Sequence, residues 1–179
     1  MNKILLSILV SASLIACTNQ DNTTASTKAN VTTTDSTKGT VTSTGPDVDL
    51  IKKSITSFAN GDWTTLASLF ADSAKSFHNV WAATNDTSVG TRIPQIIEAF
   101  KKQRALIDGN ITLGGTIYEV VTMPDGNKYG HLWAELSWKS KKGVIGKCIL
   151  FDSYGINKEG KITYEWPIYD TKDVVKLGQ

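Results

Sequence analysis

Apolar residues recur at helical spacing in three segments between residues 47 and 108. The first begins at Asp47, a residue type that caps helices, and ends at Gly61. The second begins at Asp62, and the third begins near Pro94. Their apolar positions lie three or four residues apart: Val48, Ile51, Ile55 and Phe58; Trp63, Leu66, Leu69 and Phe70; Ile93, Ile96, Ile97 and Phe100. The pattern predicts three amphipathic helices.

After Gly109 the pattern changes to runs that are typical of β-strands. Four such runs cover residues 111–122, 128–138, 143–154 and 161–169, and short turn segments separate them. A shorter strand is expected over 75–81, with a loop over 82–92. Because short turns join the four long runs, the sheet should be mainly antiparallel. Helices followed by such a meander predict an α+β domain over 47–179, in which one curved sheet wraps around the helices.

Alternation along two of these runs indicates which side chains face the helices. Alternate positions are apolar in both runs: Cys148, Leu150 and Tyr154, with Asp152 among them, and Leu132, Ala134, Leu136 and Trp138. This face should point inward. An aspartate at the end of an inward stripe would lose solvent, which raises its pKa and suits it to donate a proton or to hold a ligand. The alternative is that Asp152 only caps a loop or accepts a backbone N–H.

The opposite face of the same two runs is also rich in apolar residues. It carries Tyr129, His131, Trp133 and Glu135 on one run, and Ile145, Lys147, Ile149 and Phe151 on the next. Such a surface is too apolar to remain in water, so it should be covered. Trp133 is the side chain expected to anchor whatever covers it.

Composition narrows the classes of function. The chain has 179 residues and a net charge of +2, with 19 basic and 17 acidic side chains. A nucleic-acid-binding domain would show a basic surplus, so no nucleic-acid partner is expected. Two histidines and two cysteines show no metal-ligand spacing, and no cofactor is expected. Cys148 lies in an apolar run, where a small buried hydrophobic residue is favoured over a nucleophile.

The N-terminus has the pattern of a secretory signal. Lys3 gives it a positive start, an apolar stretch covers 4–15, and Leu14-Ile15-Ala16-Cys17 follows. This segment resembles the lipobox of bacterial lipoproteins, in which the cysteine is lipidated and becomes the first residue of the mature chain. The resemblance implies a signal peptide over 1–16, a lipid anchor on Cys17, and a place in the bacterial cell envelope, bound to a membrane.

Residues 18–46 link this signal to the domain. They contain 11 Thr, 3 Ser and 3 Asn and no aromatic residue, Leu or Ile. Such a segment buries too little apolar area to offset the entropy of ordering it. Together with the lipidated Cys17, the stretch 17–46 is therefore expected to be a disordered tether.

Several short motifs resemble the nuclear-transport-factor-2-like (NTF2-like) superfamily and its SnoaL-like branch. They are Ala-Asn-Gly-Asp-Trp at 59–63, Leu-Phe-Ala-Asp at 69–72, Gly-Lys-Ile at 160–162 and Lys-Leu-Gly at 176–178. The resemblance covers 47–179. It implies a cone-shaped α+β fold with a pocket between sheet and helices, and a homodimer formed through the outer side of the sheet.

The same resemblance assigns candidate residues. Counted against ketosteroid isomerases, the general-base position falls on His78 and the oxyanion-hole acid falls on Asp152. The isomerase's first-helix tyrosine falls on Ser54, so steroid isomerisation is not expected. His78 could equally be a surface residue on an edge strand.

Two classes of function follow. In the favoured one, the domain is a noncatalytic pocket for a small, partly apolar ligand or a partner, with Trp138, Tyr154 and Trp166 as contacts. In the other, it is an isomerase, dehydratase or cyclase that uses His78 and Asp152 for acid–base chemistry.

Overall fold

The computed structural model describes residues 38–77, 90–174 and 176. These residues lie within one compact unit of the chain. The predicted signal peptide, Cys17, most of the predicted tether and His78 lie outside the described residues. Within the described part, no helix is both long and apolar enough to cross a membrane.

The described residues form the three helices that the apolar spacing predicted: α1 (Pro46–Asn60), α2 (Trp63–Leu69) and α3 (Ile93–Arg104). Gly61 ends α1 in the left-handed conformation, and the Asp62 carboxylate caps α2 by accepting the Thr65 N–H at 3.0 Å. Asp47 does not cap α1, because Gly45 holds that position. Asp47 instead lies in the first turn, where its charge suits the helix dipole, and pairs with Lys128 at 2.7 Å.

Seven strands of the described chain form one sheet in the order β1-β4-β5-β6-β7-β2-β3. Their bounds are β1 Thr40–Thr42, β2 Phe70–Ser76, β3 Thr91–Arg92, β4 Ile107–Thr122, β5 Lys128–Ser140, β6 Ile145–Ile156 and β7 Ile162–Tyr169. All neighbours pair antiparallel except β2 and β7, which are parallel. The α+β class and the mainly antiparallel meander predicted from the sequence are thus confirmed.

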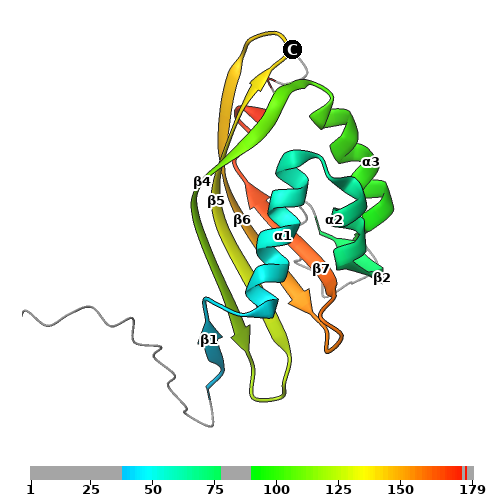
Figure 1. Ribbon diagram of the computed structural model, residues 1–179, viewed down its shortest axis with the longest axis vertical. Helices are drawn as coiled ribbons and strands as arrows, with labels where there is room; N and C mark the ends of the chain where they lie inside the picture. Colours follow the sequence, from blue (N-terminus) through cyan, green and yellow to red (C-terminus); the bar gives the residue numbers. More distant parts are fainter. Residues whose placement is uncertain (1–37, 78–89, 175, 177–179) are drawn as a thin grey trace, which may run out of the picture. The chain divides into compact units, whose positions relative to one another are not determined.

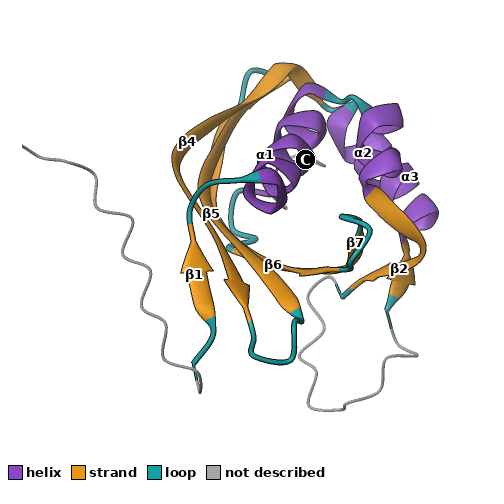
Figure 2. Cartoon of the chain, turned by 60° about the horizontal axis from the view of Figure 1, so that its bottom comes forward, coloured by secondary structure: helices purple, strands orange, loops and turns teal. Residues whose placement is uncertain are grey.

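The sheet curves around α1, while α2 and α3 lie beside that helix (Figures 1 and 2). The core is the layer between them, where Val48 and Ile51 of α1 and Leu132 of β5 are completely buried. Helix and sheet approach closely at Gly130 on β5, since a Cβ atom there would overlap the Ile51 side chain. The predicted inward face of β5 and β6 therefore does form the core side of the sheet.

Two predicted boundaries were wrong. Residues 40–42, assigned to the disordered tether, form β1 and pair with Val120, Val121 and Thr122 at the edge of the sheet. The strand expected over 75–81 begins earlier, because β2 follows α2 directly at Phe70. In both places pairing with a neighbouring strand decides the structure, and that pairing is not visible in the local sequence.

Candidate functional site

A cavity of about 100 Å³ opens between the concave face of the sheet and the helices α1 and α3. Its lining side chains are mostly apolar and come from α1, α2, α3, the strands β4 to β7 and the segment after β7: Ser54, Ile55, Phe58, Leu66, Phe100, Gln103, Arg104, Ile107, Ile111, Trp138, Cys148, Leu150, Asp152, Tyr154, Glu165, Pro167, Tyr169 and Val174. A largely apolar pocket with a few polar groups is the usual form of a small-molecule site.

Trp138 forms one wall of this cavity. It is 7% exposed and lies opposite Gly146 in the register of β5 and β6. A Cβ at Gly146 would lie 2.6 Å from the Trp138 ring, so only glycine lets the indole rest on the neighbouring strand. The absence of a side chain at this position thus helps to set the shape of the pocket.

Polar side chains gather deeper in the cavity. Asp152 and Tyr154 point inward from β6, Glu165 points inward from β7, and Ser54 faces them from α1. All are buried: Asp152 is 4%, Tyr154 1%, Glu165 7% and Ser54 3% exposed. Tyr154 and Glu165 are direct cross-strand partners. The cavity therefore holds two carboxyl groups and a phenol beyond the reach of bulk solvent.

Hydrogen bonds order this cluster. The Asp152 carboxyl accepts the backbone N–H of Trp166 at 3.2 Å. It also shares a hydrogen bond with the Tyr154 hydroxyl, which in turn bonds Ser54. Ser76 of β2 lies near Glu165 and lowers its pKa, against the larger effect of burial. The Ser76 hydroxyl makes no hydrogen bond of ordinary geometry to any described residue. Glu165 is thus the less constrained of the two acids.

Burial sets the protonation of the pair. Loss of solvent, and then the nearby Glu165, raises the pKa of Asp152 well above its usual value. Burial likewise raises the pKa of Glu165, to about 7. Burial and the neighbouring carboxyl group therefore favour the protonated form of Asp152, while Glu165, with a pKa of about 7, exchanges its proton readily near neutral pH. Such an uneven pair is what acid–base chemistry requires, and a protonated carboxyl can also donate a hydrogen bond to a ligand.

The structure brings three of the predicted site residues together: Asp152, Trp138 and Tyr154 all line the cavity. Trp166 is not among the residues that line the cavity, so its role as a ligand contact stays a prediction. Trp166 pairs with Ser153, on the face of the sheet opposite to Asp152. His78 and Cys17 lie outside the described residues.

One irregularity explains both the misplaced Trp166 and the unpredicted Glu165. On β7, Ile162 pairs with Ile156 and Tyr164 pairs with Gly155, so Thr163 is an extra residue in the ladder. Strict alternation from the buried Ile162 would turn Trp166 inward and Glu165 outward. The bulge reverses this phase, and Glu165 and Pro167 are the residues that become buried. An inward carboxylate in this run could have been found only by allowing for the bulge.

Cys148 lies in the wall of the cavity and is 7% exposed. Burial, with Asp170 and Asp173 nearby, raises its pKa to about 11. Its thiol therefore stays protonated at neutral pH, which agrees with a small buried hydrophobic residue and not with a nucleophile. The described residues contain no group of three or more His, Cys, Asp and Glu side chains placed to hold a metal ion.

Comparison with known proteins gives the fold and no more. No protein-family model matches the chain, and no curated protein matches it. Among solved structures, it is similar to a putative polyketide cyclase from Xanthomonas campestris, with a TM-score of 0.55 at 10% identity over 74% of this chain and 96% of the other. It is also similar to an NTF2-like protein from Burkholderia xenovorans, with a TM-score of 0.52 at 12% identity over 75% and 96%.

A third similar structure is a Mycobacterium tuberculosis protein in complex with estradiol-17beta-hemisuccinate. Its TM-score is 0.52 at 17% identity, over 73% of this chain and 98% of the other. These likenesses carry fold and not activity, because the identities are low. Together with the curved sheet around α1, they show that residues of this chain adopt the NTF2-like α+β fold that the sequence motifs implied.

Proposed function

We propose that the domain binds a small, partly apolar molecule that carries a carbonyl or hydroxyl oxygen. One observation supports this most directly: an apolar cavity holds the buried Asp152, whose surroundings favour its protonated form, beside Tyr154 and Glu165. An apolar body would fill the space between Trp138 and Phe100, while its oxygen accepts a hydrogen bond from the buried acid. Neighbours of the same fold are described with small organic ligands, estradiol-17beta-hemisuccinate and trimethylamine, which supports the class of ligand.

A matched pair of probes tests this proposal. Cyclohexanone and methylenecyclohexane have nearly the same shape, but only the ketone can accept a hydrogen bond. The ketone should bind about fivefold to tenfold more tightly, as one net hydrogen bond of about 1 kcal/mol predicts. Binding can be followed by tryptophan fluorescence, with Trp138→Phe to identify the reporting residue. Equal affinity for the two probes, or no binding of either, would contradict the proposal.

A second candidate is an enzyme that moves a proton next to a carbonyl group. The pKa of about 7 at Glu165 favours it, because this carboxylate could take a proton at neutral pH while Asp152 and Tyr154 stabilise the resulting enolate oxygen. Tyr154, bonded to Ser54, would supply from the sheet the phenol that the resemblance places on the first helix. Some similar structures are putative polyketide cyclases.

A test for turnover distinguishes the binding protein from the enzyme. In heavy water, an enzyme of this kind should exchange deuterium into the carbon next to the carbonyl of bound cyclohexanone. Asp152→Asn and Glu165→Gln would each abolish that exchange while binding weakens only modestly. If the protein only binds, no exchange occurs and Trp138→Ala lowers the affinity more than either acid variant does. Loss of binding in both acid variants would speak against the enzyme.

We further propose that Cys17 is lipidated and anchors the chain to a membrane of the bacterial envelope. The apolar stretch 4–15 and Leu14-Ile15-Ala16-Cys17 support this. Two or three acyl chains, at about 0.8 kcal/mol per buried methylene, would hold the protein far more durably than one. The Thr-rich residues that follow would then keep the pocket away from the lipid.

A homodimer through the outer face of the sheet completes the proposal. Large apolar side chains form one cross-strand row over β4 to β7: Ile117, Trp133, Phe151 and Ile168. Ile117 is 60% exposed, Trp133 36% and Ile168 50%. The rings of Trp133 and Phe151 lie 5.0 Å apart. A second copy would cover this row with the same row, as a two-fold axis requires.

A further inference from the structure

Arg104, in the last turn of α3, lines the cavity with an incompletely satisfied guanidinium group. One Nη donates to Asn110 at 3.1 Å and to the Ala59 carbonyl at 3.5 Å. The Nε is buried and has no hydrogen-bond partner among the described residues. No carboxylate of the described chain forms an ion pair with this arginine. The hydrogen bond to the Ala59 carbonyl, at the end of α1, explains part of the position of the Arg104 side chain. It does not explain why the Nε–H is buried without a partner.

Arg104 lies at the mouth of the cavity. The lining residues that keep some exposure come from the end of α1, the last turns of α3 and the end of the chain: Phe58, Phe100, Gln103, Arg104, Tyr169 and Val174. The Cys148 end of β6 lies near the mouth, because the backbone N–H of Lys147 donates to Asp173, the neighbour of Val174, at 3.3 Å. Asp152 and Tyr154 follow Cys148 along β6 and so lie farther from the mouth. At roughly 3.3 Å per residue, about 13 Å of strand separate Cys148 from Asp152. A ligand that fills the cavity therefore meets an arginine at one end and the buried acids at the other.

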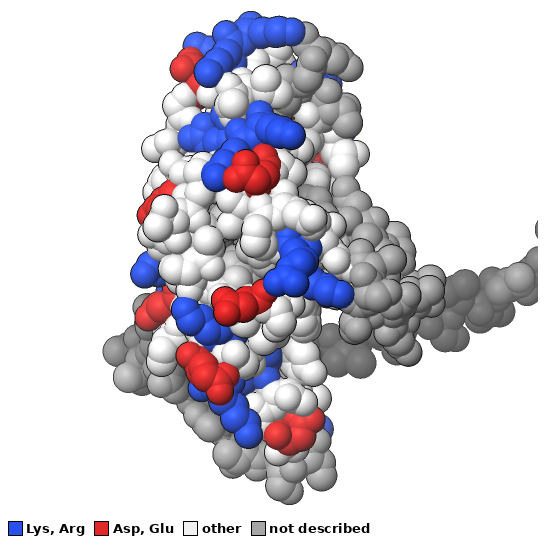
Figure 3. Space-filling model, turned by 90° about the vertical axis from the view of Figure 1, so that its right-hand side faces the viewer, with Lys and Arg blue, Asp and Glu red and all other residues white. Residues whose placement is uncertain are grey.

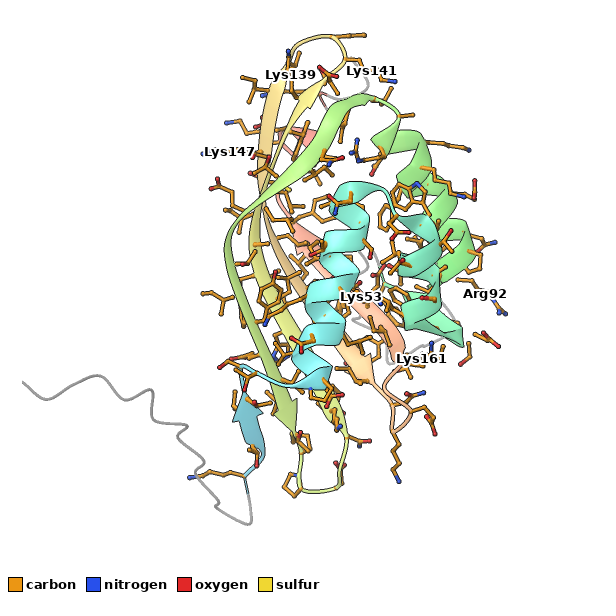
Figure 4. The ribbon with its side chains drawn as sticks, in the orientation of Figure 1. Lys53, Arg92, Lys139, Lys141, Lys147 and Lys161 are labelled. Carbon is orange, nitrogen blue, oxygen red and sulfur yellow. The ribbon has the colours of Figure 1, made fainter. Side chains whose placement is uncertain are left out.

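The same end of the domain is rich in positive charge. Lys139, Lys141 and Lys147 stand at the upper end of the sheet, away from Lys53, Arg92 and Lys161 (Figure 4). In the space-filling view, Lys and Arg side chains gather at this end of the molecule. Lower down, Lys and Arg are interspersed with Asp and Glu (Figure 3). The acids nearby include Asp108, which lies 3.9 Å from Lys139, and Asp173, which pairs with Lys176 at 2.6 Å. Asp170 also lies near Cys148. The lysines at this end favour the approach of an anion.

We propose that the ligand is a carboxylate with an apolar body and a hydroxyl or carbonyl oxygen at its far end. This rests on the proposed binding function and names the class of ligand. Arg104 binds the carboxylate at the mouth, where the Nη that bonds no described residue donates to one carboxylate oxygen. A small turn of the side chain lets a second N–H join it in the planar fork that matches two carboxylate oxygens. The far oxygen reaches the Asp152 and Tyr154 end. The same turn of the Arg104 side chain would bring the buried Nε–H, which has no hydrogen-bond partner among the described residues, toward the carboxylate.

Matched probes on the native chain test the carboxylate directly. A cavity of about 100 Å³, open at the mouth, suits chains of roughly six to ten carbon atoms with the head group at Arg104. Each ω-hydroxy acid of such a series is compared with the diol of the same length, near neutral pH, by calorimetry. The acid should bind about tenfold more tightly than its diol, and the difference should shrink as salt is added.

Three variants test whether Arg104 causes the preference for the acid over the diol. Arg104→Gln should remove the preference for the acid, and Arg104→Lys should retain only part of it, because an ammonium group lacks the fork. Lys102→Gln is the matched control: it removes the same charge from an exposed side chain of the same turn that does not line the cavity. The preference should survive in this variant. If Arg104→Gln fails to fold, the comparison of acid and diol on the native chain still decides.

The outcomes distinguish this inference from the function on which it rests. Equal affinity of acid and diol for the native chain overturns the carboxylate proposal but leaves a pocket for neutral ligands. The carboxylate proposal is also overturned if the preference for the acid over the diol survives in Arg104→Gln but is lost in Lys102→Gln. Surface charge, and not Arg104, would then be the cause of the preference. If neither the acids, the diols nor cyclohexanone bind, the proposed function fails and this inference fails with it.

Discussion

The two buried carboxyl groups make the stability of the domain depend on pH. In the unfolded chain Asp152 and Glu165 ionise at their usual values of 3.8 and 4.5, but burial raises the pKa of both in the folded state. The folded protein therefore binds more protons than the unfolded one above these values. Their contribution to stability is fully present below the unfolded pKa and is lost as the pH rises through the folded pKa.

For Glu165 this window runs from about pH 4.5 to about pH 7. The free energy of unfolding should fall by about 3 kcal/mol across it from this residue alone. Glu165→Gln removes the ionisation while keeping the shape, so this variant should show a smaller fall and exceed the native protein in stability at alkaline pH. Urea unfolding at a series of pH values measures both. Glu159→Gln, on an exposed turn residue, should leave the profile unchanged, and an unaltered profile in Glu165→Gln would contradict the assignment.

Single residues of the site were predictable where the ladder is regular. β5 and β6 pair without a break from Lys128 to Lys139, so alternation placed Asp152, Tyr154 and Trp138 on the inner face correctly. The bond between Tyr154 and Ser54 was not predictable, because it joins a strand to a helix a hundred residues away in the chain. The sequence showed that the isomerase phenol is missing from α1, but only the packing shows a phenol arriving there from β6.

At the scale of elements, prediction failed where the neighbour decides the structure. The bulge at Thr163 turned Glu165 inward and Trp166 outward against the alternation that the run suggests. β1 was missed because Thr40–Thr42 is exposed and mostly polar; it is a strand only because β4 offers a free edge. Helix ends were easier to predict, because Gly61 and Asp62 act on the backbone of their own turn.

The contact between α1 and β5 gives a sharp test of how these elements pack. Gly130→Ala places a methyl group against the Ile51 side chain and should destabilise the domain by about 1–3 kcal/mol. Gly114→Ala is the control, because its Cβ would lie 4.0 Å from the nearest atom, in ordinary contact. It should be neutral or slightly stabilising. Thermal unfolding of both variants measures the difference, and equal melting temperatures would mean that α1 does not lie as described.

β1 provides a second test at this scale. A chain that starts at Lys38 keeps β1, and a chain that starts at Ser43 loses the strand and exposes the edge of β4 while keeping the start of α1. The shorter chain should fold but melt a few degrees lower, since about 1 kcal/mol corresponds to about 2–8 °C in domains of this size. Calorimetry of the two chains measures the shift. Identical melting temperatures would show that β1 adds nothing to stability.

At the scale of the whole molecule, the proposed lipid anchor can be tested by removing a single atom, the sulfur of Cys17. Cys17→Ala removes the sulfur to which lipid would be attached, so the variant should leave the membrane fraction, while the native chain stays there until detergent is added. Mass spectrometry of the detergent-extracted chain should show acyl groups on Cys17. An unmodified Cys17 in membrane-extracted protein would end the lipoprotein hypothesis.

The outer face of the sheet predicts the state of assembly. Besides the row from Ile117 to Ile168, Ile149 is 58% and Ile145 79% exposed on the same face. A monomer rarely leaves so many large apolar side chains next to one another in water. The Glu119–His131 pair, at 3.2 Å, borders the row and gives it a polar edge. An apolar centre with a polar rim is the arrangement found in protein interfaces.

Sedimentation of the folded domain should therefore show a dimer, and Trp133→Glu should convert it to a monomer with its fold intact. The glutamate would place an unpaired charge at the centre of the contact, where Trp133 packs on Phe151 at 5.0 Å, and such a charge costs several kcal/mol on burial. Met123→Glu is the matched control, because Met123 is 40% exposed at the far turn of the β4–β5 hairpin. It should leave the dimer unchanged. A native chain that sediments as a monomer at high concentration would rule out this interface. Dissociation of the dimer by Met123→Glu would show that the contact lies at the turn of the β4–β5 hairpin and not at Trp133.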